Sequence, residues 1–471
     1  MLRSSSSPQR HLHCVAAALL GAWLAGAPAA APGAAAATEE EAVVDAASLI
    51  EPALLSGPGF SVDPHVELRG YMAHFTLDTR LGTLQAPSVE MLTEREAELP
   101  ALERLDAATH SEAFVRAAGD RLGHTVESLV NIALHPVDTV TGLPVGVARY
   151  LRDRLVRQAN QAQSLTDRAA RKLGNIGEPF PADQGPMTQA RDGDATDAPA
   201  ARRKTWYTRI AREGERYVKR ELKFNTVKRD IARRLGIDPY STNPQVQERL
   251  VALAWVGSAG SFSAGAALDA VGGVGADILA KGGQIDEIVW RLSPDDLRAR
   301  NATRLQAHCR DALLVRQFVR RGAFSPTLQT ALVDALDALQ PATGCDAFLE
   351  LAMSARSELE ARFLVNGLAL VHSALGAHAH GGHLLTIGAG FAFRADDGEL
   401  LLPLAVDRLS WTDDAARYFA LAPLREGRRR VLIAGDATAL AAERLAELGW
   451  RVELRAPRGP NTTRAAATAD R

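Results

Sequence analysis

The feature that most constrains this chain is its N-terminus, because it determines the compartment in which the rest folds. Arg3 and Arg10 precede an uncharged, Ala- and Leu-rich run over residues 15–31, and four alanines at 34–37 lead into Thr38 and three glutamates. A positive end, a short apolar core and small residues before the return to charge are typical of a secretory signal peptide. An uncleaved anchor helix is the alternative, which two prolines in this stretch disfavour. The sequence predicts a mature chain beginning near Thr38, in the periplasm or cell envelope of a bacterium.

Composition indicates a globular protein of more than one domain. After removal of the leader, about 430 residues remain, which is too long for one ordinary domain. Alanine is abundant and aromatic residues make up only 5% of the chain, so we expect close-packed helices. Loss of Arg3 and Arg10 changes the formal net charge from −2 to −4. Such a small charge gives no reason to expect a nucleic-acid partner.

Only two cysteines, Cys309 and Cys345, lie in the predicted mature chain. In an exported protein two cysteines can form a disulfide, because the oxidising periplasm preserves such bonds. Two unpaired buried thiols, acting as small hydrophobic side chains, are the alternative. The sequence leaves both open.

The basic segment, residues 202–236, is the most uneven part of the charge distribution. It carries thirteen Lys and Arg against four Asp and Glu, with Trp206, Tyr207, Tyr217 and Phe224 among them. Outside the cytoplasm, anionic phospholipid is a more natural partner for it than nucleic acid. A solvated basic helix face is the simpler interpretation.

An apolar Gly/Ala-rich run follows the basic segment, over residues 251–268, and has no charge between Arg249 and Asp269. Its length is close to the minimum for crossing a bilayer. Its small residues at four-residue spacing would let helices approach closely, in a membrane or in a core. A buried, Gly-kinked helical hairpin and a membrane-inserted one both remain possible.

The C-terminal part is predicted to be a small α/β module. Residues 384–394 and 399–406 flank Asp396-Asp397-Gly398, a typical hairpin turn. A buried strand at 430–435, an amphipathic helix at 437–448 and a strand at 450–454 then have the lengths of a βαβ unit. Near the other end, extended stretches at 66–77 and 83–86 predict one β-hairpin, after a short helix over 42–55.

The nearest approach to a site is a histidine cluster. His378 and His380 would share one face of an extended strand, and His383 could close over them from the Gly381-Gly382 turn. Three imidazoles suit a transition metal such as Zn or Cu. No Cys, Asp or Glu adjoins them in the sequence, and the spacing matches no zinc signature. An exposed His-rich loop is the alternative, and the chain contains no complete catalytic signature.

Three motifs resemble those of an uncharacterised family of exported proteobacterial proteins. They are the hairpin followed by Leu92-Thr-Glu-Arg-Glu, the segment from His135-Pro136 to Val147, and Asp238-Pro-Tyr-Ser-Thr-Asn-Pro244. The resemblance covers most of the mature chain. It implies export and a shared architecture, and no site residues.

These patterns together predict a mainly α fold with an N-terminal β-hairpin and a small C-terminal α/β module (β-hairpin plus βαβ). The predicted segments are a signal peptide (1–37), a hairpin and helical region (38–173), a disordered linker (174–201), a helical domain with the basic helix and apolar hairpin (202–355), the α/β module (356–454) and a disordered tail (455–471). We expect an exported envelope protein, non-enzymatic, that binds a membrane surface, with anionic lipid as its partner, or another envelope protein. A transition-metal-binding protein or metal-dependent enzyme using the histidine cluster is the alternative.

Overall fold

The computed structural model describes residues 38–116, 223–258, 287–376 and 380–458. The chain from Glu39 onward forms one compact unit. The predicted signal peptide, the linker at 174–201 and most of the basic segment lie outside the described residues.

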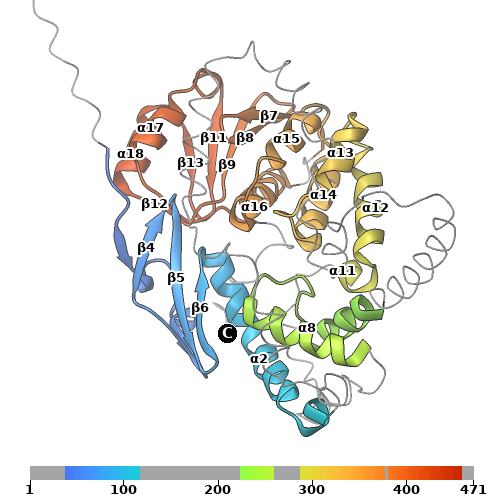
Figure 1. Ribbon diagram of the computed structural model, residues 1–471. Coiled ribbons are helices and arrows are strands. Elements are labelled where there is room, and N and C mark those ends of the chain that lie inside the picture. The colour runs from blue at the N-terminus through green and yellow to red at the C-terminus, as the bar shows by residue number, and fades with distance from the viewer. Residues whose placement is uncertain (1–37, 117–222, 259–286, 377–379, 459–471) are drawn as a thin grey trace, which may run out of the picture. The chain divides into compact units, whose positions relative to one another are not determined.

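The prediction of a mainly α fold with one N-terminal hairpin is wrong, because the N-terminal part is a six-stranded antiparallel sheet (Figure 1). Strand β5 is its centre, paired with β4 and then β3 on one edge and with β6 on the other. β1 pairs β4 and β2 pairs β3 at the two margins. The strands are β1 (Val43–Asp45), β2 (Ser56–Gly57), β3 (Phe60–Val62), β4 (His65–Arg69), β5 (Met72–Thr79) and β6 (Gly82–Ala86).

A tight turn inside a run of alternating residues explains part of this error. The stretch predicted as a single strand over 66–77 is divided at Gly70 and Tyr71, which have φ angles of 60° and 67°. Two positive φ angles in a two-residue loop match the right-handed twist of the flanking strands, so they suit a tight hairpin. Residues 42–55, predicted as a helix, contain β1, the 3-10 helix η1 (Ala46–Ser48) and the four-residue α1 (Pro52–Leu55).

The C-terminal sheet is mixed and has five strands in the order β13-β11-β9-β8-β7. The strands are β7 (His383–Ile387), β8 (Gly390–Arg394), β9 (Leu400–Leu404), β11 (Arg429–Ile433) and β13 (Arg451–Glu453). β7, β8 and β9 form an antiparallel meander, whereas β9, β11 and β13 are parallel. The predicted strand at 384–394 is therefore two strands, divided at Gly388, whose φ is 60°. The predicted βαβ unit corresponds to β11, α18 (Ala439–Glu447) and β13.

Helices cover both faces of the C-terminal sheet. In Figure 1, α16 (Glu358–Leu375) lies on one side, and α17 (Asp413–Phe419) and α18 lie on the other. All five residues of β9 are buried, as expected for a strand between two helical layers. A two-stranded parallel pair, β10 (Arg408–Leu409) with β12 (Asp436–Ala437), and the 3-10 helix η4 (Ala422–Leu424) complete this part.

Three of the remaining helices, α2, α12 and α14, begin after a serine N-cap. Ser88, Ser293 and Ser325 each accept a hydrogen bond from a backbone N–H of the first turn. The helices are α2 (Val89–Thr109), α8 (Pro244–Ser258), α11 (Glu287–Arg291), α12 (Pro294–Leu305), α13 (Ala312–Phe318), α14 (Pro326–Leu339) and α15 (Cys345–Ala352). A further helix covers residues 223–235.

Helix α2 links two smaller cores. Met91 and Leu92, in its first turn, pack with Phe75 of the N-terminal sheet. Leu102 and Leu105, farther along, pack with α8 and with the helix at 223–235. The largest core lies between α12–α16 and the C-terminal sheet.

Candidate functional site

The structure does not assemble the predicted histidine site among the residues it describes. His378 lies outside them. His380 and His383 are exposed, and Nδ1 of His383, at the start of β7, lies 2.9 Å from Oγ1 of Thr343. Asp396 comes closer than the sequence suggests, since its Oδ1 accepts the Gly382 N–H at 2.9 Å. Even so, no group of three His, Cys, Asp or Glu side chains in the described parts is placed to hold a metal ion.

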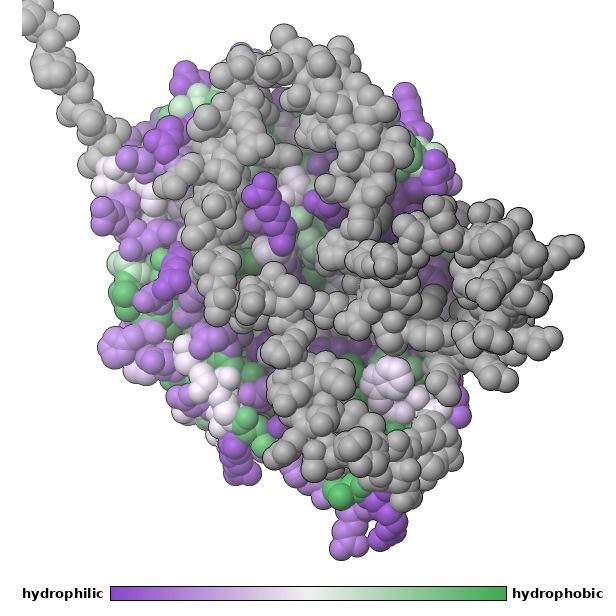
Figure 2. All heavy atoms as spheres, viewed as in Figure 1, coloured by the Kyte–Doolittle hydropathy of each residue, from purple (hydrophilic) through white to green (hydrophobic). Residues whose placement is uncertain are grey.

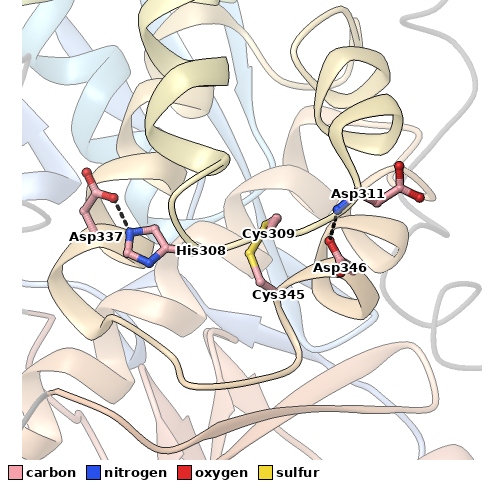
Figure 3. The surroundings of a disulfide bond; sticks show 6 residues. All are labelled: His308, Cys309, Asp311, Asp337, Cys345 and Asp346. Atoms are coloured by element: carbon pink, nitrogen blue, oxygen red, sulfur yellow. Dashed lines mark hydrogen bonds and ion pairs between the residues drawn. A yellow bond between two sulfur atoms is a disulfide. The ribbon is translucent and has the colours of Figure 1, made fainter.

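Cys309 and Cys345 are joined as a disulfide, with their Cα atoms 5.0 Å apart (Figure 3). The bond connects the segment after α12 to the first residue of α15. Both cysteines are buried, with exposed fractions of 2% and 3%. Thiol–disulfide exchange requires a thiolate to reach one of the two sulfur atoms. Because both cysteines are buried, this bond does not exchange readily and is a structural crosslink.

Polar contacts hold the backbone on either side of this disulfide. As Figure 3 shows, the His308 imidazole points to Asp337 of α14, with Nε2 and Oδ1 2.5 Å apart. On the other side, the Asp311 N–H donates to Oδ1 of Asp346 at 3.0 Å. The chain is therefore fixed at both ends of the turn that carries Cys309.

The described end of the basic segment uses several of its cations within the fold. Nε of Arg229 donates to the Trp290 carbonyl at 3.1 Å, and Arg233 pairs with Glu287 at 3.4 Å. Both partners belong to α11. Lys223, at the start of this helix, is exposed. Residues 202–222, which hold most of the charge, lie outside the described residues.

An aromatic pair stands at the surface where the helix at 223–235 meets α8. The rings of Phe224 and Trp255 are 5.1 Å apart, tilted by 40°. Trp255 is 46% exposed, an unusual state for the largest apolar side chain. The neighbouring residues Leu253, Ala254 and Val256 are buried, so Trp255 projects from the outward side of α8. In Figure 2, hydrophobic side chains (green) are visible beside hydrophilic ones (purple) in the lower part of the view, where α2 and α8 lie.

The predicted apolar hairpin is only partly described. Residues 251–258 form the second half of α8, and residues 259–268 lie outside the described parts. No described helix is both long and apolar enough to cross a bilayer.

No sequence pattern indicates the ionic network around Arg362. This side chain, 11% exposed, lies between three carboxylates: Glu90 and Glu94 of α2, at 2.8 and 2.6 Å, and Glu358 of α16, at 2.7 Å. Burial opposes the charge on Glu358, but the Arg362 guanidinium outweighs this and holds the pKa of Glu358 below its ordinary value. Arg458, beyond the predicted end of the module, also pairs with Glu90, at 3.1 Å. Because every group is matched within the fold, the network fastens α2 to α16.

Asp436, in β12 after the parallel strand β11, also has its partner within the fold. Its two oxygens accept from Nε and Nη2 of Arg455 at 2.9 and 2.8 Å. Thr438 is the N-cap of α18. The structured chain thus continues past the predicted start of the tail at residue 455.

Comparisons with family models, curated proteins and solved structures found no match to this chain.

Proposed function

We propose that this protein is an exported, non-enzymatic envelope protein that attaches to an anionic membrane surface. The observation that carries the proposal is the Phe224–Trp255 pair at the end of the basic segment, in which Phe224 is half-buried and Trp255 is exposed. Tryptophan suits a bilayer interface, because its large ring is apolar and its N–H is polar. Lysine and arginine beside it supply the attraction to anionic headgroups.

The charge next to the aromatic pair favours lipid over an uncharged partner. Phe224 follows Lys223 directly, and the 21 residues before Lys223 hold eight further Lys and Arg against three Glu. Each cation close to an anionic surface contributes about 1 kcal/mol of binding free energy, screened within a Debye length. Burial of the Trp255 ring adds an apolar contribution that salt does not screen. The proposed attachment thus has a salt-sensitive part and a salt-resistant part.

Vesicle flotation of the mature protein tests this. We expect binding to phosphatidylglycerol vesicles, weaker binding as salt rises, and none to neutral phosphatidylcholine vesicles. Trp255→Ala should lower the partition coefficient by about tenfold, equivalent to about 1.4 kcal/mol. The matched control is Leu448→Ala, which removes another exposed apolar side chain (40% exposed) at the end of α18.

Two results would contradict the proposal. If the protein does not bind anionic vesicles at low salt, lipid is not its partner. If Trp255→Ala binds as tightly as Leu448→Ala, the aromatic pair is not the contact. Export is checked separately: after expression in a Gram-negative host, the protein should appear in the envelope or periplasmic fraction without about 37 N-terminal residues.

A further inference from the structure

An open groove of about 650 Å³ lies at the amino ends of the parallel strands β9, β11 and β13. This volume is within the range of small-molecule sites. In Figure 1, β12 lies at the other end of these strands, because it follows the carboxyl end of β11. The groove is lined by residues at the start of each strand or just before it: Asp397, Glu399, Gly427, Arg428, Arg429, Gly449 and Arg451.

The carboxyl ends of the same strands, where open α/β sheets usually bind their ligands, are closed by the described chain itself. A Cβ at Gly435, after β11, would overlap the Asp407 backbone carbonyl, so two backbone segments are in direct contact there. Asp436 and Arg455 pair with each other at the same end. A ligand of this sheet would therefore find its space at the amino ends.

Each carboxylate in the groove is already matched by an arginine. Asp397 pairs with Arg428, which lines the groove beside it. Glu399 pairs with Arg430 of β11 at 3.1 Å. Neither carboxylate is left to balance the other cations of the groove.

Arg429 is held in place by groups that do not neutralise it. Its Nη1 and Nη2 donate to the backbone carbonyls of Leu424 and Leu448, both at 2.7 Å. Its guanidinium carbon lies 5.4 Å from the centroid of the Trp450 ring, within the range of a cation–π contact. Because this side chain is already ordered, an anion that binds beside it does not have to order it.

Arg451, the first residue of β13, is exposed and has no partner among the described residues. Its register partner on β11 is Arg430, so the two side chains project from the same face of the sheet. The carboxylates within reach of that face, Glu399 and Glu453, are both paired with Arg430. The Arg451 guanidinium therefore keeps its fork of N–H donors free for an anion.

We propose that this groove binds a phosphomonoester, with Arg451 donating to the phosphate oxygens and Arg429 balancing the charge. A phosphomonoester carries about two negative charges at neutral pH, whereas a carboxylate carries one. Two matches the number of cations, Arg429 and Arg451, that no carboxylate of the groove compensates. Arginine also pairs with phosphate through two parallel hydrogen bonds. The phosphate can belong to a small soluble molecule or to a lipid headgroup, and the groove itself does not depend on the proposed membrane attachment.

Calorimetric titration of the full mature chain with inorganic phosphate tests the groove, with acetate and chloride at equal ionic strength for comparison. Arg451→Gln removes the guanidinium from an exposed position, so the fold should survive. Arg316→Gln, at an exposed position of α13, is the matched control, because it changes the net charge equally. We expect saturable phosphate binding that Arg451→Gln weakens about tenfold or more, equivalent to about 1.4 kcal/mol. Arg316→Gln should bind phosphate like the unmodified protein.

Asp397→Asn tests the same groove in the opposite direction. The amide oxygen can still accept the Glu399 N–H, as Oδ1 of Asp397 does at 3.0 Å, but the charge that pairs with Arg428 is gone. We expect this variant to bind phosphate about threefold more tightly, because solvent screens the exposed pair that it breaks. Weaker phosphate binding by Asp397→Asn would contradict the proposal.

Three further results would overturn the proposal: no phosphate binding by the unmodified chain, equal binding by Arg451→Gln and Arg316→Gln, or acetate binding as tight as phosphate binding. Flotation with phosphatidic acid vesicles identifies the source of the phosphate. For a lipid headgroup, Arg451→Gln binds these vesicles more weakly than Arg316→Gln; for a soluble phosphate ester, the two variants bind alike. Failure of the membrane proposal looks different, because Trp255→Ala then has no effect on vesicles while the phosphate titration still responds to Arg451→Gln.

Discussion

Oδ2 of Asp407 lies 2.9 Å from the backbone N of Ala73, which joins the C-terminal sheet to the N-terminal one. The same oxygen accepts the N–H of Val89, the first residue of α2, at 3.2 Å. In return, the N–H groups of Asp407 and Arg408 donate to the Tyr71 carbonyl at the tip of the β4–β5 turn, both at 3.1 Å. One buried carboxylate therefore positions two elements, β5 and the start of α2, that are more than 300 residues from it in the sequence.

This carboxylate should make stability depend on pH. Burial raises the pKa of Asp407 from 3.8 to about 6, although its backbone hydrogen bonds lower it in part. Between these values the folded protein holds a proton that the unfolded chain releases, so the contribution of Asp407 to stability falls as pH rises from about 4 to 6. A difference of about two pKa units corresponds to roughly 3 kcal/mol.

Asp407→Asn isolates this effect. The amide oxygen can take the place of Oδ2 and accept both N–H groups, but the side chain cannot ionise. Urea unfolding across this pH range should show a smaller fall in the free energy of unfolding for Asp407→Asn than for the unmodified protein. Parallel pH profiles for the two proteins would show that Asp407 does not titrate in this range.

Gly344 should not tolerate a side chain. Its φ is +90°, and a Cβ there would overlap the Leu384 backbone carbonyl of β7. The carbonyl oxygen and carbon of Leu384 are backbone atoms and cannot move aside. We therefore expect Gly344→Ala to lower the free energy of unfolding by about 3 kcal/mol or more. Gly322→Ala is the matched control, because a Cβ at Gly322 meets no atom within 4 Å and its φ is not positive. Thermal unfolding should separate the two; equal melting temperatures would contradict the prediction.

The disulfide should contribute strongly to stability. It closes a loop of 36 residues, for which the chain-entropy relation gives about 4 kcal/mol. Replacing both cysteines by Ala should lower the free energy of unfolding by about this amount. Mass spectrometry of the protein alkylated after unfolding without a reductant should find neither cysteine labelled. Two alkylated thiols would show that the bond is absent.

The sequence predicts best those features that depend only on residues close together in the chain. The serine N-caps and the strand-helix-strand unit near the C-terminus depend on neighbouring residues, and the structure has them. The stretches 66–77 and 384–394 were each predicted as one strand, and each is two. Gly70 and Gly388 turn the chain inside stretches whose residue pattern is that of a single strand. Neither turn contains the Asn-Gly or Asp-Gly pair that marks such hairpins in sequence.

The candidate sites show the same limit. Phe224 and Trp255 belong to segments that the sequence singles out, but their contact depends on how α8 packs against the helix at 223–235. The Arg362 network joins residues up to 368 positions apart, and no sequence periodicity indicates such a pairing.

Removal of the central cation of the network should be costly in a way that depends on pH. Arg362→Met keeps most of the side-chain volume but leaves Glu90, Glu94 and Glu358 without their guanidinium. Removing one partner of a buried ion pair costs about 3–5 kcal/mol, because the remaining charge is buried without compensation. Burial already raises the pKa of Glu94 to about 7, and without Arg362 burial should also raise the pKa of Glu358 above its unfolded value, so the folded variant takes up protons as the pH falls. The deficit in unfolding free energy should therefore be largest at about pH 7.5 and smaller at about pH 5. Arg428→Met is the control, since its pair with Asp397 is 64% and 63% exposed and solvent screens such pairs so that they add little to stability. If Arg362→Met unfolds at the same urea concentration as Arg428→Met at both pH values, the network does not fasten α2 to α16.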